Sequence, residues 1–138
     1  MSYWKNLNIG MFLVVSLGLL LAQPSPAEDA GIKGTTKVRV GGGRFGNKPK
    51  EKVTRVEFAV APFVEGKPDY HNAISVTSND DGSYAVSLPA GKYWIGPLAK
   101  AHDPQNYLPG AVAVVEQVVV VQEHTWTLVD VLEIGNAP

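Results

Sequence analysis

The histidines are the residues best suited to chemistry near neutral pH, and their spacing indicates no shared site. The chain has three histidines and no cysteine. Each of His71, His102 and His124 lies among loop residues, and none lies within four residues of another histidine. No pair therefore has the short spacing typical of metal ligands carried on one element. The sequence predicts exposed histidines that bind nothing, no catalytic residue, no metal and no cofactor.

A second group with possible chemistry is the acidic run Asn79, Asp80 and Asp81. Its oxygens are the kind of ligand that Ca²⁺ prefers, but Ca²⁺ needs six to eight of them, and three consecutive residues cannot converge alone. Asx side chains before Gly82 are also typical of a tight turn, in which they bond to their own backbone. We expect a turn without a metal, with calcium binding as the alternative.

Three aromatic residues are the best candidates for binding. Trp94 alternates with Tyr93 and Ile95, so it points away from the face that these two residues share. With Tyr70 or Tyr107 it would form a surface for sugar rings or for the prolines of a protein partner. Against this, we favour the interpretation in which residues 96–110 cover Trp94.

The segments that carry these candidate residues have the alternating apolar pattern of β-strands. Short runs with a period of two alternate with turn residues, which is typical of an antiparallel β-sandwich. Phe58 is expected inside with Val56 and Val60, and residues 96–110 are expected to be a long crossover loop without a helix. We count seven strands, at residues 35–40, 53–60, 73–78, 84–88, 93–95, 111–121 and 125–134. The segment 111–121 is either one strand or a pair of strands broken at Glu116 and Gln117.

Three further side-chain directions follow from this pattern. Ile74 and Val76 are expected to face inward. Residues 118–121 are all valine, as in a strand that is buried on both faces. Trp126 shares its phase with Leu128 and Leu132 and is expected in the core, although Asp130 has the same phase.

Residues 77–95 contain the most specific pattern in the chain. A turn at Asp81 and Gly82 precedes the alternating strand 84–88, and a Pro-Ala-Gly turn leads into the next strand. This pattern resembles the signature of the carboxypeptidase regulatory-like domains, which belong to the prealbumin-like (transthyretin-like) β-sandwiches. The residues that match are Asp81, Gly82, Tyr84, Leu88, Pro89, Gly91 and Tyr93.

The resemblance implies a small Greek-key sandwich that is usually non-catalytic and often binds or stabilises. Some prealbumin-like proteins are enzymes, so a small secreted hydrolase or oxygenase is the alternative. The intradiol dioxygenases hold iron with two Tyr and two His, including a close His pair that this chain lacks. The hydroxyisourate hydrolases end in a Tyr-Arg-Gly-Ser tail, whereas this chain ends in Gly-Asn-Ala-Pro.

The amino-terminal residues have the layout of a secretory signal peptide. A polar start with Lys5 precedes an apolar run at residues 9–22, and the small residues Ser25 and Ala27 precede a cleavage point before Glu28. The apolar run is shorter than the roughly 20 residues that a spanning helix needs, although an uncleaved anchor is the alternative. We expect residues 1–27 to be removed, leaving a secreted or periplasmic domain at residues 28–138 with no membrane span.

The charge and composition of the chain limit the classes of partner that it is expected to bind. The chain has a net charge of −1 and no basic cluster, which does not fit nucleic-acid binding. Export without cysteines fits a bacterial protein. The sequence therefore predicts a secreted, non-catalytic β-sandwich module with an unknown protein or carbohydrate partner.

Overall fold

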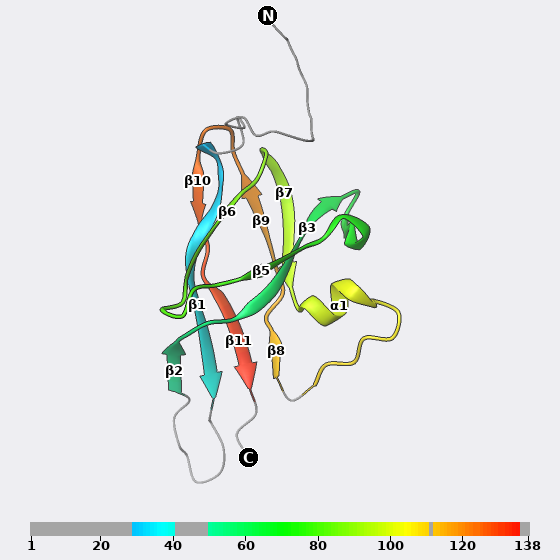
Figure 1. Ribbon diagram of the computed structural model, residues 1–138. Helices are drawn as coiled ribbons and strands as arrows, with labels where there is room; N and C mark the ends of the chain where they lie inside the picture. The colour runs from blue at the N-terminus through cyan, green and yellow to red at the C-terminus, as the bar shows by residue number, and fades with distance from the viewer. Residues whose placement is uncertain (1–28, 41–49, 111, 136–138) are drawn as a thin grey trace, which may run out of the picture.

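The computed structural model describes residues 29–40, 50–110 and 112–135, and these residues form two β-sheets (Figure 1). The predicted signal peptide lies outside them. One sheet contains six strands, β1 (Gly31–Val40), β2 (Lys50–Val53), β6 (Ser83–Ser87), β8 (Val112–Val114), β10 (Trp126–Leu128) and β11 (Val131–Gly135). The other contains five, β3 (Glu57–Val64), β4 (Lys67–Pro68), β5 (Ile74–Thr77), β7 (Gly91–Gly96) and β9 (Gln117–Val121). The predicted all-β, two-sheet architecture is confirmed.

Strand β1 organises the six-stranded sheet. Its first half, residues 31–35, pairs antiparallel with β6 and, at residues 31–33, parallel with β10. Its second half pairs antiparallel with β2 and parallel with β11, and β8 completes the sheet beyond β11. The expectation of a purely antiparallel sandwich is therefore wrong. The strands β1, β10 and β11 come from opposite ends of the chain, so no hairpin fixes their relative direction.

The five-stranded sheet is antiparallel throughout. Strand β3 pairs with β4, β5 and β7, and β7 pairs with β9, which forms one end of this sheet. The core lies between the sheets, where alternate residues of the strands meet. Phe58 and Val60 are fully buried there as predicted, and Tyr84 and Tyr93 are buried against the same cluster. The ring of Tyr84 meets that of Phe58 edge to face, with the ring centroids 5.2 Å apart.

The count of seven strands is wrong because predicted strands are divided and short ones were missed. The chain leaves β2 at Val53 and enters β3 at Glu57, so the predicted strand 53–60 passes from one sheet to the other. The predicted strand 125–134 is divided at Val129 and Asp130 into β10 and β11. The first division takes the chain from one sheet to the other, whereas β10 and β11 both pair with β1, along different stretches of it.

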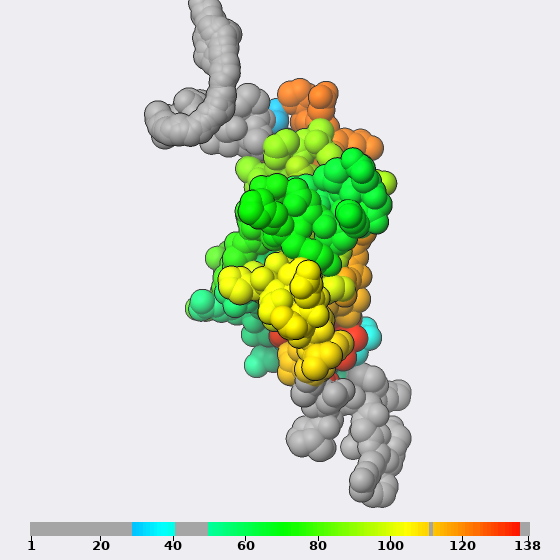
Figure 2. All heavy atoms as spheres, turned by 90° about the vertical axis from the view of Figure 1, so that its right-hand side faces the viewer, coloured from blue at the N-terminus to red at the C-terminus, as the bar shows by residue number. Residues whose placement is uncertain are grey.

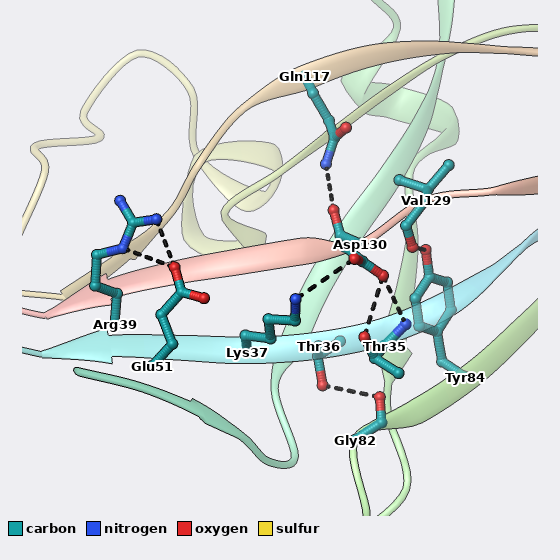
Figure 3. Close-up of polar contacts among 10 residues, drawn as sticks. All are labelled: Thr35, Thr36, Lys37, Arg39, Glu51, Gly82, Tyr84, Gln117, Val129 and Asp130. Atoms are coloured by element: carbon teal, nitrogen blue, oxygen red, sulfur yellow. Dashed lines mark hydrogen bonds and ion pairs between the residues drawn. The ribbon is translucent and has the colours of Figure 1, made fainter. Parts of the chain in front are cut away.

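Asp130 explains the second division (Figure 3). Its carboxylate accepts hydrogen bonds from the backbone N–H and the hydroxyl of Thr35, at 3.3 and 3.1 Å, and lies 3.6 Å from Lys37 Nζ. The N–H of Thr35 is therefore bonded to a side chain between the segments of β1 that pair with β10 and β11. These contacts lie on the outer face, so Leu128, of the same phase, is 76% exposed, while Val129 and Val131 are buried. The predicted phase of this segment is wrong, because the carboxylate rather than the larger apolar side chains selects the outer face.

Burial of the whole valine run is wrong for a simpler reason. Val118 and Val120 are 47% and 53% exposed, because β9 ends its sheet and its outer face is uncovered. Ile74 and Val76 share the inner face with their register partners Val60 and Phe58, as predicted, but Ile74 is 44% exposed on β5, which pairs only with β3. A run of valines therefore indicates a strand here but not burial of both faces.

The prediction of a loop without a helix at residues 96–110 is also wrong. The helix α1 spans Leu98–His102, and a 3₁₀ turn, η3, spans Tyr70–Asn72. Pro97 precedes α1 with φ −64°, and the Leu-Ala-Lys-Ala run that follows favours a helix. Both elements pack against β3 on the outer face of the five-stranded sheet. That face, rather than the interior, carries the candidate site.

Candidate functional site

The indole of Trp94 lies at the bottom of the candidate site. It projects from β7 onto the outer face of the sheet, where Ala59 and Ala61 of β3 leave room for it, and it is only 3% exposed. Gly96 also belongs to this fit, since an added Cβ would lie 2.2 Å from Trp94 Cζ2. Three small residues on neighbouring strands thus accommodate one large ring.

The helix α1 and the turn η3 cover this ring. Ala101 is buried in the same cluster, and Leu98 packs against it. The ring of Tyr70 meets the indole edge to face, with the ring centroids 5.2 Å apart and the planes at 89°. Covering of Trp94 by residues 96–110 is therefore confirmed. Figure 2 turns this side toward the viewer and shows the green segment of η3 beside the yellow segment of α1.

In addition to the strand β3 beneath the indole and the elements α1 and η3 over it, a carboxylate binds the indole N–H. Glu116, between β8 and β9, accepts a hydrogen bond of 2.9 Å from Trp94 Nε1. Lys100 Nζ of α1 lies 2.9 Å from each of its oxygens. Burial alone would raise the pKa of Glu116, but the hydrogen bonds from Lys100 and Trp94 offset this effect, so its pKa is lowered. The ion pair therefore connects α1 to the segment between β8 and β9.

Tyr107 lies in the same neighbourhood. The hydrogen bond to Glu116 is the largest cause of the raised pKa of Lys100, and electrostatic interactions with the phenol groups of Tyr70 and Tyr107 raise it further. Both tyrosines are half-buried, whereas Trp94 is buried. We call Tyr70, Trp94, Lys100, Tyr107 and Glu116 the outer aromatic cluster.

The structure thus brings the three aromatic residues named from the sequence into one region, with unequal exposure. Lys100 and Glu116 were missed, because they are 16 positions apart and meet only when α1 folds against the sheet. One signal was available for Glu116, which is the single charged residue in the apolar run at 111–121. An isolated carboxylate in such a run indicates a partner elsewhere in the chain.

The arrangement of the cluster favours recognition over catalysis. Both oxygens of Glu116 are occupied by Lys100, and one of them also by the indole, so this carboxylate is poorly placed to act as a general base. The side chains of Tyr70 and Tyr107 are partly exposed. Such groups contribute apolar area and hydrogen bonding at low entropic cost.

The histidines lie apart from each other. His71 and His102 are exposed in η3 and at the end of α1, and His124 pairs with Asp29 beside the turn between β9 and β10. Within the described ranges, no group of three or more His, Asp or Glu side chains is placed to hold a metal ion.

The acidic run at residues 79–81 forms a turn whose oxygens and amides bond locally. Asp81 Oδ1 accepts hydrogen bonds from the N–H and the hydroxyl of Ser83, at 2.9 and 2.6 Å, and these bonds lower the pKa of Asp81. Asn79 Nδ2 donates to the same hydroxyl, and Gly82 takes φ +84°. Asp80 points to solvent, 3.5 Å from Arg55. The side chains therefore shape the passage from β5 to β6.

No protein-family model matches this chain, and neither a curated protein nor a solved structure matches it. Among the helices of the described residues, none is long and apolar enough to cross a membrane.

Proposed function

We propose that this chain is a secreted or periplasmic, non-catalytic β-sandwich module that binds a protein or carbohydrate partner through the outer aromatic cluster. The proposal rests on Tyr70 and Tyr107, two half-buried side chains near the buried indole of Trp94 and the partly exposed Lys100–Glu116 pair. Rings that are already held lose little entropy on binding, and partly exposed tyrosines are frequent anchors of interfaces.

The resemblance to the carboxypeptidase regulatory-like domains supports a binding role of this kind. The turn at Asp81 and Gly82 joins β5 of one sheet to β6 of the other, as connections of a Greek key do. Tyr84 and Tyr93 of the signature are core residues on β6 and β7. We therefore propose a prealbumin-like Greek-key sandwich, exported with the help of residues 1–27.

The test starts from the exported protein and the partner that it retains. Crosslinking in the cell envelope and a glycan array identify that partner, and calorimetry then measures its affinity for purified protein. We expect Tyr70→Ala with Tyr107→Ala to weaken binding by roughly tenfold or more, about 1.4 kcal/mol, because tyrosine anchors commonly contribute that much. The melting temperature of the double variant reports whether the fold is intact.

The matched control is His71→Ala with His102→Ala, two exposed residues, one on η3 with Tyr70 and one at the end of α1, before Tyr107. Equal affinity of the wild type and the tyrosine variant would contradict the proposal, as would an equal loss of affinity in the histidine control. Turnover of the partner by purified protein would show an enzyme instead.

A further inference from the structure

A second aromatic site lies on the other sheet, around Trp126 at the start of β10. An added Cβ on Gly31 of β1, the register partner of Trp126, would lie 2.9 Å from Trp126 Cζ3. The indole therefore packs against the backbone of β1 rather than in the interior, and it remains partly exposed. Leu128, the next residue of the same phase, is exposed beside it.

Among the residues that the structure describes, the charges of this outer face are paired except for one. Lys37 lies 3.6 Å from Asp130, and Arg39 donates two hydrogen bonds to Glu51 (Figure 3). Lys33, on the same face of β1, has no carboxylate partner among the described residues. Its Nζ lies over the Trp126 ring instead, 5.9 Å from the centroid. An unpaired ammonium thus lies beside a partly exposed indole.

These groups fit a ligand in which a carboxylate is attached to a ring with an apolar face. The ammonium of Lys33 would bind the carboxylate through a charge-assisted hydrogen bond, and the C–H groups of the ring would pack on the indole. A uronic acid has both features. Asp or Glu beside Pro in a peptide has them too, but peptides are bound mainly at sheet edges and in grooves, whereas these residues lie on the face of a sheet.

We propose that Lys33 and Trp126 form a binding site for an acidic polysaccharide that contains uronic acids. Exposed Ala85 and Ser87 of β6 lie opposite Lys33 and Gly31 and leave this part of the face without a large side chain. A linear glycan can lie along such a surface without an edge or a cleft. The site lies on the sheet that does not carry the outer aromatic cluster, so it is independent of the function proposed above.

The experiment titrates the mature protein with an oligomer of galacturonic acid and, separately, with the same oligomer as its methyl ester, which keeps the rings and removes the charges. The readout is calorimetry together with the indole N–H resonance of Trp126 in NMR spectra. We expect millimolar or tighter binding of the acid, a shift of the Trp126 resonance but not of Trp94, and roughly tenfold weaker binding of the ester, because the ester cannot pair with Lys33.

Lys33→Gln should weaken binding of the acid by a similar factor and leave binding of the ester unchanged. Lys37→Gln is the matched control on the same strand and face, and it should bind as the wild type does. Trp126→Ala should lose both oligomers, and Trp126→Phe, which keeps a ring, shows whether that loss reflects unfolding.

Four outcomes would overturn the proposal. They are no binding of the acid at millimolar concentration, equal binding of acid and ester, equal losses in Lys33→Gln and Lys37→Gln, and tighter binding of a Pro-Asp repeat peptide than of the uronate oligomer. The last outcome would assign the site to a protein partner.

Discussion

Thr36 shows how one hydroxyl can join the two sheets. It is fully buried on β1, and its Oγ1 lies 2.5 Å from the carbonyl oxygen of Thr54 and 2.6 Å from Ser78 Oγ. Ser78, which follows β5 of the other sheet, accepts a hydrogen bond of 2.8 Å from the N–H of Val56. With Thr36 donating to Thr54 and Ser78 donating to Thr36, each hydroxyl proton has one acceptor.

The first prediction concerns this network. Thr36→Val keeps the shape of the side chain but leaves Ser78 and the carbonyl of Thr54 with one partner fewer in the interior, so we expect a loss of about 1–3 kcal/mol in the free energy of unfolding. Urea denaturation measures it. Thr77→Val, at an exposed position of β5, is the control and should change little. Equal stability of both variants would show that water or relaxation replaces the lost bonds.

The second prediction concerns pH. His124 has φ +56° and pairs with Asp29, whose hydrogen bond and charge raise the pKa of His124 above its ordinary value of 6.5. A raised pKa in the folded state means that the pair stabilises fully below 6.5 and that this contribution is lost as the pH rises through the folded pKa.

Melting temperatures of the wild type and of Asp29→Asn measure this contribution. The difference between the two proteins should be largest near about pH 5.5, small because the pair is exposed, and should disappear at high pH, when the imidazole is neutral. His102→Gln, at an exposed histidine, should show no such trend. A difference that grows with pH would reverse the sign of the coupling.

At the scale of elements, residues 93–96 of the strand β7 are buried on both faces. Its Tyr93 and Ile95 lie in the core between the sheets, while Trp94 lies under α1 and η3. The short helix and turn therefore act as a third layer over part of one sheet. The outer aromatic cluster depends on that layer.

The third prediction compares the two faces. Tyr84→Ala removes a core ring whose hydroxyl donates to the carbonyl of Val129, at 2.6 Å, and Trp94→Ala removes the base of the third layer and leaves Glu116 with Lys100 alone. We expect each change to lower the free energy of unfolding by about 3–5 kcal/mol, because both rings are buried. Chemical denaturation of both variants measures these losses. A cost for Trp94→Ala far below that for Tyr84→Ala would mean that the third layer is only marginally formed.

The sequence predicted correctly those turns and strand directions that depend only on residues close together in the chain. The turn before Gly82, the alternation that buries Tyr84, and the small-residue turn that leads into β7 all follow from neighbouring residues. The pairing of Lys100 with Glu116 could not be predicted, because it depends on how α1 folds back over the sheet. The outward phase of Trp126 also depended on a distant partner, since Asp130 takes its hydrogen bonds from Thr35 of β1.

At the scale of the molecule, export remains a prediction. Residues 1–27 have the layout of a signal peptide, and cleavage would leave Glu28 as the first residue, next to Asp29. Asp29 pairs with His124. The first described residue of the mature chain would therefore lie at the end of the sandwich where β9 turns into β10.

The fourth prediction tests this processing. Expression of the full chain in a bacterial host should yield exported protein whose intact mass begins at Glu28 or within a few residues of it, because signal peptidase cleaves after small residues such as Ala27. A variant with bulky residues at positions 25 and 27 should accumulate uncleaved. Recovery of full-length wild-type protein in the membrane fraction would indicate an anchor instead.

The position of β1 has a consequence for the order in which the chain can fold. The first strand to be synthesised lies in the middle of its sheet, and β10 and β11, which pair with it in parallel, are the last. A nascent chain therefore has no complete six-stranded sheet until its final residues emerge. Such distant pairings slow folding, since the loop must close before the contacts form. A late-folding chain stays extended for longer, and an extended chain is the form that a narrow secretion channel can thread.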